Sequence, residues 1–191
     1  MQIIRSMWEQ DSTTFEGKHY RVQGVARAAA LPPGGRPRIL IGGGGRKVLG
    51  VAGRHADIVG VNPSLPEGRV TAATARDLAP ARVREKVGWV RAAAQRAGRD
   101  PDAIELNSLV FLVAITDTPA GVRAGVSQNT GMSVEEVADC PLFITGSPAE
   151  IRDRLEKRRE ETGISYIVIQ GTREDVLESF AQHVVEPLAG R

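Results

Sequence analysis

The sequence predicts an α/β protein whose sheet is built from parallel strands. Short, continuously apolar segments rich in Ile, Leu and Val recur along the chain and alternate with amphipathic helices. Such segments are typical of parallel strands, because both faces of a parallel sheet are covered. An antiparallel sheet with one face in water would instead alternate apolar and polar residues. The pattern alone leaves open whether the sheet closes into a barrel or stays an open, doubly wound sheet.

The first part of the chain predicts a helix, a hairpin and a loop. Apolar residues recur at helical spacing over residues 1–9. Residues 14–25 have the composition of two short strands that turn at 16–18. The prolines and glycines that follow predict a loop that runs to residue 38.

The rest of the chain, residues 39–191, predicts four strand–helix (βα) units, so that the whole chain forms one domain. The expected strands are 38–41, 56–61, 104–116 and 164–169. The expected helices are 46–54, 81–97, a looser stretch at 119–139, 147–162 and a last helix that begins at Thr172. The segment between the second strand and residue 80 is expected to be a loop. The helix at 147–162 has the clearest boundaries, because Ser147 is a good N-cap and Gly163 a good stop.

Composition and charge exclude several classes of protein. The chain has 191 residues, with 25 basic and 23 acidic side chains and a net charge of +2. No basic run gathers that excess, so we expect no nucleic-acid partner. The longest apolar run, Leu109–Ile115, is too short to cross a membrane. With Cys140 as the single cysteine and no signal-peptide pattern, we expect a cytoplasmic protein.

The most informative local feature is the glycine run Gly42, Gly43, Gly44 and Gly45, directly after a predicted strand. Without Cβ atoms, the backbone N–H groups of such a turn can approach an anion, and the next helix adds its dipole. The run lacks the Lys-Ser/Thr ending of a Walker A loop, because Val48 follows Lys47. It also lacks the third glycine of the dinucleotide fingerprint. A phosphate-accepting turn and a glycine turn chosen for sharp packing both remain open.

Other side chains offer little chemistry. Asn62 follows the second predicted strand at the same sheet edge, where it suits a ligand contact or a turn with Pro63. The three histidines, His19, His55 and His183, have no carboxylate at metal-ligand spacing. The residues alone therefore predict no metal site and name no catalytic acid or base.

Four segments together resemble the luciferase-like monooxygenase family. Trp8, Asp11, Thr14, Phe15, Gly17 and Tyr20 match the family's Trp-x-x-Asp-x-x-Thr-Phe-x-Gly-x-x-Tyr hairpin pattern. Residues 37–45 are similar to the family's fifth strand, and residues 52–62 to its sixth. Residues 146–151, Gly-Ser-Pro-Ala-Glu-Ile, resemble the step that begins its penultimate helix. Within the family the chain looks most like the branch that uses the deazaflavin coenzyme F420.

This resemblance implies a partial (β/α)8 TIM barrel. The chain would hold the four C-terminal βα units, preceded by a hairpin insertion within residues 1–38. The family binds flavin or deazaflavin at the C-terminal mouth of the barrel. By the resemblance, the backbone of Gly42–Gly45 would hold the phosphate of F420, or of FMN as the alternative, with Arg46 and Asn62 beside it.

The implied function is an oxidoreductase that transfers hydride between the cofactor and a small organic substrate. A complete barrel of this type takes about 250 residues, so this chain corresponds to the second half only. Met1 falls within the family's fourth helix, which fits a misassigned start, a truncated gene or a true half-barrel. We expect weak or no activity from the chain alone, and a homo-oligomer, because a half-barrel exposes two strand edges. The alternatives are a non-catalytic flavin- or phosphate-binding half-barrel and an interaction module that pairs with a separate N-terminal half.

Overall fold

The computed structural model describes residues 1–27, 30–31, 33–65, 68–171 and 173–189. The chain forms two compact units, Met1–Ile39 and Leu40–Arg191. Within the described residues, no helix is both long and apolar enough to cross a membrane.

The described residues of the first unit form a helix and a hairpin, as the sequence predicts. Helix α1 spans Gln2–Glu9, and strands β1 (Ser12–Glu16) and β2 (Arg21–Ala26) pair antiparallel. The hairpin closes where the Gly17 amide donates to the Tyr20 carbonyl oxygen at 2.9 Å. The predicted loop up to residue 38 includes positions 28, 29 and 32, which lie outside the described residues.

The second unit is built on a four-stranded parallel sheet in the order β3-β4-β5-β8. Its strands are β3 (Leu40–Gly43), β4 (Ile58–Val61), β5 (Glu105–Val110) and β8 (Ile164–Ile169). All three pairings are parallel. The α/β class and the parallel sheet are therefore confirmed.

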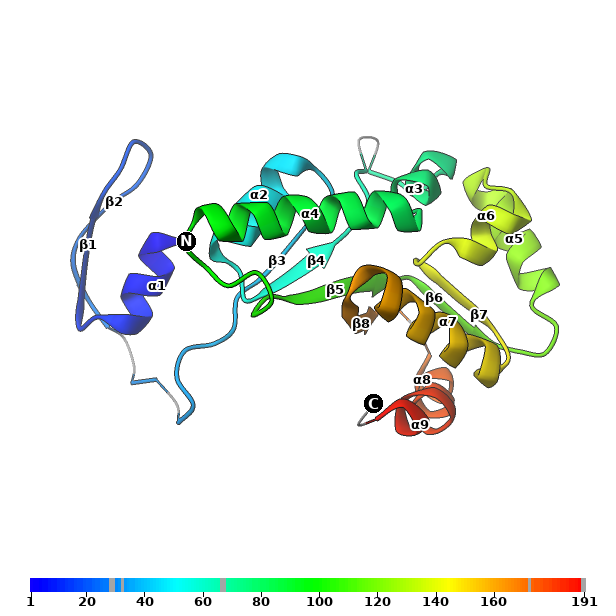
Figure 1. Cartoon of the computed structure of the whole chain (residues 1–191). Helices are drawn as coiled ribbons and strands as arrows, with labels where there is room; N and C mark the ends of the chain where they lie inside the picture. The colour runs from blue at the N-terminus through cyan, green and yellow to red at the C-terminus, as the bar shows by residue number, and fades with distance from the viewer. Residues whose placement is uncertain (28–29, 32, 66–67, 172, 190–191) are drawn as a thin grey trace. The chain divides into compact units, whose positions relative to one another are not determined.

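Helices α2 (Arg46–His55) and α4 (Pro80–Arg96) cover one face of this sheet (Figure 1). Val59, Val61 and Leu106 project from that face into a cluster with buried aliphatic residues of both helices. The opposite face carries a row of register-paired residues, Gly42, Gly60, Asn107 and Tyr166. At this row the two faces of the sheet thus differ: one side is an aliphatic core, and the other carries glycine and polar side chains.

A second, two-stranded parallel sheet joins β6 (Leu112–Ile115) to β7 (Phe143–Gly146). Helices α5 (Ala120–Thr130) and α6 (Val134–Asp139) lie between these strands in sequence. Helix α7 (Pro148–Thr162) has the predicted Ser147 as its N-cap, which forms a capping box with Glu150, and Gly163, with φ 76°, as its C-cap. The C-terminal segment comprises α8 (Glu174–Phe180), the π-helical turn η1 (Ala181–Val185) and α9 (Glu186–Leu188).

Two expectations about the elements are wrong. The expected loop before residue 80 contains a short helix, α3 (Ala72–Asp77), because Thr71 and Thr74 form a capping box. The single strand expected at 104–116 is two strands, since the chain leaves the β8 pairing after Val110 and then pairs with β7. Strand β7 lies in residues 140–146, to which the sequence assigns neither a strand nor a helix. Thr172, the expected start of the last helix, lies outside the described residues.

Candidate functional site

The glycine run lies where β3 ends and α2 begins. Gly42 and Gly43 are the last residues of β3, Gly44 lies in the turn, and Gly45 is the N-cap of α2. Because β3 is parallel to its neighbour, this turn is at the carboxyl edge of the sheet, where α/β proteins bind ligands.

The loop after β4 packs directly against this turn. The amide of Asn62 donates to the carbonyl oxygen of Gly43 at 3.0 Å, which extends the strand pairing by one step. A Cβ atom on Gly44 would lie 2.4 Å from backbone atoms of Pro63 and Ser64. No side chain fits at that distance, so Gly44 is required by the close approach of two backbone segments. The structure therefore brings the glycine run and Asn62 together, as the sequence predicts.

On the open face of the sheet, two glycines allow a close approach of the neighbouring Asn62 side chain and of the strands themselves. A Cβ atom on Gly42 would lie 2.9 Å from Nδ2 of Asn62, and one on Gly60 would lie 3.1 Å from the Cα of Gly42. Asn107 borders the same row and donates from Nδ2 to the Tyr166 carbonyl oxygen at 3.1 Å. Two glycines and two asparagine amides thus form a polar floor beside the turn. Oδ1 of Asn62 is buried and accepts no hydrogen bond from any described residue.

The start of α2 is suited to an anion. Gly45 contributes no capping side chain, and the first turn of α2 contains no acidic residue. Instead, it carries Arg46 and Lys47, both exposed. Cations near a helix N-terminus oppose the helix dipole, whereas an anion bound there would interact favourably with both. A Cβ atom on Gly45 would meet no atom within 4 Å, so the space beside this N-terminus is open.

Arg46 does not lie against Asn62. Its guanidinium carbon is 6.0 Å from the centre of the Trp89 ring on α4. The guanidinium of Arg82 lies over the same ring at 4.9 Å. The structure thus groups Gly42–Gly44 with Asn62, while the Arg46 side chain rests against α4.

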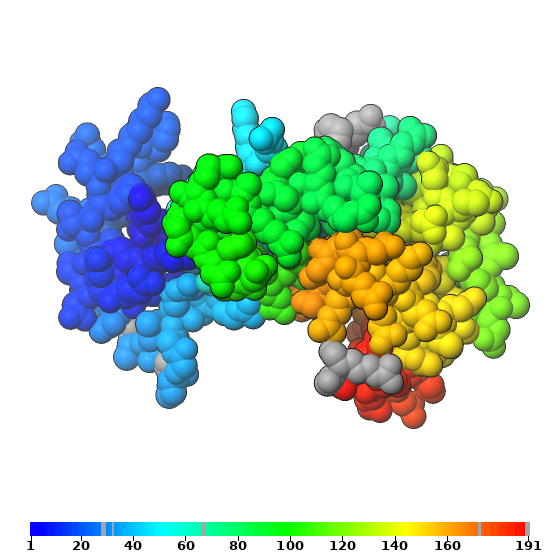
Figure 2. All heavy atoms as spheres, in the orientation of Figure 1, coloured from blue at the N-terminus to red at the C-terminus, as the bar shows by residue number. Residues whose placement is uncertain are grey.

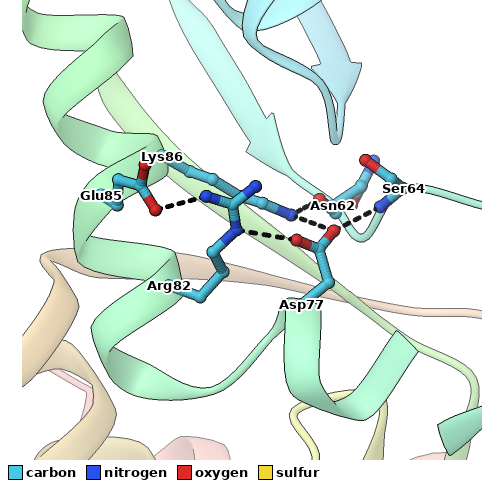
Figure 3. A network of polar contacts seen from close by, with 6 residues as sticks. All are labelled: Asn62, Ser64, Asp77, Arg82, Glu85 and Lys86. Carbon is cyan, nitrogen blue, oxygen red and sulfur yellow. Dashed lines mark hydrogen bonds and ion pairs between the residues drawn. The ribbon is translucent and has the colours of Figure 1, made fainter. Parts of the chain in front are cut away.

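A network of charged side chains fixes the loop after β4 (Figure 3). Nζ of Lys86 lies 2.6 Å from Oδ2 of Asp77 and 2.9 Å from the Asn62 carbonyl oxygen. The same carboxylate oxygen accepts a hydrogen bond from the Ser64 amide at 2.7 Å. Oδ1 of Asp77 accepts from Nε of Arg82 at 3.0 Å, and Arg82 also contacts Glu85. Among these residues, only Asn62 is predicted from the sequence to be a site residue.

Ionisation of the Asp77–Lys86 pair depends on this geometry. Burial opposes the charge on Asp77, but the hydrogen bonds from Lys86, Ser64 and Arg82 outweigh it and hold the pKa of Asp77 below its usual value. Burial lowers the pKa of Lys86, and Asp77 offsets only part of that effect. The pair is structural: it holds the backbone of Asn62 and Ser64 against the glycine turn.

Metal chemistry has no visible support in the part of the chain that the structure describes. No group of three or more His, Cys, Asp or Glu side chains there is arranged to hold a metal ion. Cys140 is buried, and burial raises the pKa of its thiol, so this sulfur is a poor nucleophile.

A family model matches the sequence of this chain, and several solved structures match its fold. The family model described as luciferase-like monooxygenase matches residues 1–139. No curated protein sequence matches the chain. The fold is similar to the coenzyme F420 dependent tetrahydromethanopterin reductase of Methanopyrus kandleri, with a TM-score of 0.70 and 17% identity, over 97% of this chain and 61% of that one.

Two further solved structures are similar. One is a riboflavin lyase with modified FMN and riboflavin, with a TM-score of 0.65 and 17% identity, over 93% of this chain and 48% of that one. The other is the EDTA monooxygenase of Chelativorans sp. BNC1, with a TM-score of 0.66 and 20% identity, over 93% of this chain and 50% of that one. At such identities the likeness concerns the fold alone. The chain spans about half the length of these two structures.

Proposed function

Because the chain belongs to the luciferase-like monooxygenase family, we propose that it is part of an oxidoreductase that uses F420, or FMN as the alternative. The substrate would be a small organic molecule. One similar structure depends on coenzyme F420 and another holds a modified FMN, which supports a cofactor of this class.

The observation that carries the proposal is the open N-terminus of α2 directly after the glycine turn. A Cβ atom on Gly45 would meet nothing within 4 Å, and the first turn of α2 contains no acidic residue. Both F420 and FMN carry a phosphate, which a glycine turn at a helix N-terminus accepts through backbone N–H groups. The exposed Arg46 and Lys47 add positive charge at the same end of α2. The residues present therefore fit a phosphate group.

Each part of the site would have its own task. Gly44, Gly45 and the first turn of α2 would hold the phosphate, and Arg46 would contribute through its charge. Asn62 and Asn107 would offer amide groups on the open face of the sheet, where the buried Oδ1 of Asn62 still lacks a donor among the described residues. The bound cofactor would supply the redox chemistry, a hydride exchange with the substrate.

The chain would form four C-terminal βα units of a (β/α)8 barrel. Its four-stranded sheet is half of the eight strands that close such a barrel. We therefore propose weak or no turnover for this chain alone, since the remaining barrel strands of its relatives would contribute much of the site. We also place the protein in the cytoplasm, where the buried Cys140 thiol would stay reduced.

A homo-oligomer is the second part of the proposal. Strands β3 and β8 end the sheet, and within the described residues each pairs with one neighbour only. Unpaired edges of a parallel sheet expose backbone N–H and C=O groups and favour association. Light scattering after gel filtration tests this: a dimer or larger species is expected, and a stable monomer would contradict it. An added N-terminal half-barrel that converts such oligomers into a one-to-one complex would instead favour the pairing-module alternative.

The cofactor proposal is tested by titrating the folded chain with FMN, riboflavin and F420 and following fluorescence. Riboflavin is the matched control, because it has the ring of FMN without the phosphate. We expect FMN or F420 to saturate and riboflavin to bind at least about tenfold more weakly, since charge-assisted hydrogen bonds to phosphate contribute well over 1 kcal/mol. Equal binding of FMN and riboflavin would show that the glycine turn does not hold phosphate. No binding of any of the three would overturn the cofactor site in this chain.

A further inference from the structure

A cavity lies between α4 and α7, on the helix-covered side of the sheet. Figure 2 shows the two helices, green and orange, packed side by side. The cavity has a volume of about 230 Å³. Its lining includes the apolar side chains of Leu78, Val83 and Ile164 and the cationic side chains of Arg154, Lys157 and Arg158 on α7. None of the residues assigned above to the phosphate site lines this cavity.

The two arginines differ in how firmly they are held. Arg154 donates to the carbonyl oxygens of Thr145, at 3.2 Å, and of Ala138, so it fastens α7 to the segment around β7. Arg158 makes one long contact, 3.5 Å from Nη1 to the Pro141 carbonyl oxygen. Within the described residues, neither arginine forms an ion pair with a carboxylate. Arg158 therefore has donors left for a ligand.

The neighbouring charges do not neutralise Arg158. Burial and the adjacent Arg154 lower the pKa of Arg158 to about 10, so its positive charge is poorly compensated. Burial raises the pKa of the nearby Cys140 thiol, which therefore stays protonated and is no counter-ion. Glu161 also lines the cavity, but its Oε1 lies 4.0 Å from Nζ of Lys157, so its charge is paired with Lys157. Asp139, another lining residue, is exposed.

We propose that this cavity binds a small organic anion, a short-chain carboxylate. Its carboxylate would accept hydrogen bonds from Arg158, and its hydrocarbon part would contact Leu78, Val83 and Ile164. The carboxylate would supply the negative charge that this cation lacks, in a site where water is partly excluded. The apolar lining distinguishes the ligand from inorganic phosphate, which has no hydrocarbon part. The inference is independent of the cofactor proposal.

The test compares butyrate and hexanoate with butyramide and hexanamide, which have nearly the same shape without the charge. Binding to the full chain is measured by calorimetry and by the shift of the thermal midpoint. We expect the carboxylates to bind and to raise the midpoint, and the amides to bind at least about tenfold more weakly, as expected for loss of a charge-assisted hydrogen bond. Equal binding of acid and amide, or no binding of either, would overturn the proposal.

Two variants locate the site. Arg158→Met removes the charge and keeps a side chain of similar length, so carboxylate binding should fall at least about tenfold. Arg84→Met is the matched control, because Arg84 is exposed on α4 and does not line the cavity. Unchanged butyrate binding by a folded Arg158→Met variant would overturn the assignment. If that variant does not fold, Arg158→Lys takes its place: it keeps the charge and loses the guanidinium donors, so hexanoate should bind more weakly than to the wild type, and unchanged binding of hexanoate would count against Arg158 as the hydrogen-bond donor.

Discussion

The ammonium group of Lys86 is completely buried and lies 2.6 Å from the carboxylate of Asp77. The same nitrogen donates to the Asn62 carbonyl oxygen, and the same carboxylate accepts from the Ser64 amide. The pair thereby connects α3 and α4 to the loop that contacts Gly44 (Figure 3). Each charge is tolerated there because the other is present, so the position of the loop depends on both.

Lys86→Met is expected to destabilise the protein strongly. It leaves the Asp77 carboxylate, only 17% exposed, without its nearest cation, and breaking a buried pair from one side costs about 3–5 kcal/mol. The free energy of unfolding in urea measures the effect. The double variant Lys86→Met/Asp77→Leu should recover part of the loss, because no charge is then left unpaired. A single variant that loses under about 1 kcal/mol would show that the pair does not hold this loop.

Acid should remove the contribution of Asp77 to stability. Its pKa in the folded protein is lower than the ordinary value of 3.8, so near that pH the unfolded chain binds more protons. The contribution is therefore complete above 3.8 and is lost as the pH falls through the lower, folded value. Asp77→Asn should be less stable than the wild type at neutral pH, and the difference should shrink below about pH 4. Thermal midpoints of both proteins from neutral pH to about pH 2.5 measure it. A difference that stays constant would contradict the assigned ionisation.

Gly44→Ala and Gly45→Ala should behave differently although the residues are adjacent. A Cβ atom added at Gly44 would meet the Pro63 and Ser64 backbone at 2.4 Å, whereas one added at Gly45 would meet nothing within 4 Å. Gly45 has φ −98°, which any residue adopts. We expect Gly44→Ala to lose about 1–3 kcal/mol of stability and to weaken FMN binding, and Gly45→Ala to stay within about 1 kcal/mol of the wild type. Urea unfolding and FMN titration test both. Equal effects would mean that the loop after β4 moves freely.

The sequence predicts the main parallel sheet well, because each strand is apolar and its flanking helices have clear ends. The two-stranded sheet escapes prediction for physical reasons. The apolar run through Phe111 hides the bend between β5 and β6, since both sides of the bend are equally apolar. Strand β7 has four residues, too few for a periodic pattern, and α3 carries no apolar stripe. These elements depend on partners that are distant in sequence.

The glycine turn and Asn62 were identified because parallel strands bring their carboxyl ends together at one edge. The Asp77–Lys86 pair was not identified, because no local sequence pattern indicates that a carboxylate and an amine nine residues apart form an ion pair. One signal existed: Lys86 falls on the same face of α4 as Val83 and Val90, both buried. A charged residue within an apolar stripe indicates a buried partner, so the stripe signals that Lys86 is paired but does not identify Asp77 as the partner.

Two glycines of α2 should respond to alanine in opposite directions. A Cβ on Gly53 would lie 2.4 Å from the Val90 carbonyl oxygen and 3.0 Å from the Ala93 Cβ, so α2 and α4 are in backbone contact there. Gly50 faces only the end of the Arg54 side chain, at 3.7 Å. Gly53→Ala must push the helices apart and should cost about 1–3 kcal/mol, whereas Gly50→Ala should stabilise by about 0.5–1 kcal/mol through helix propensity.

The same pair of variants tests whether helix packing positions the phosphate site. Because α2 begins at Arg46, a shift of the whole helix would move its N-terminal amides away from the glycine turn. Gly53→Ala should therefore weaken FMN binding more than riboflavin binding, and Gly50→Ala should change neither. Urea unfolding measures the stability of each variant, and fluorescence titration measures FMN and riboflavin binding under conditions where the variant is folded. A Gly53→Ala variant that is destabilised yet binds FMN normally would show that the turn holds its geometry through the loop after β4, independently of the contact between α2 and α4.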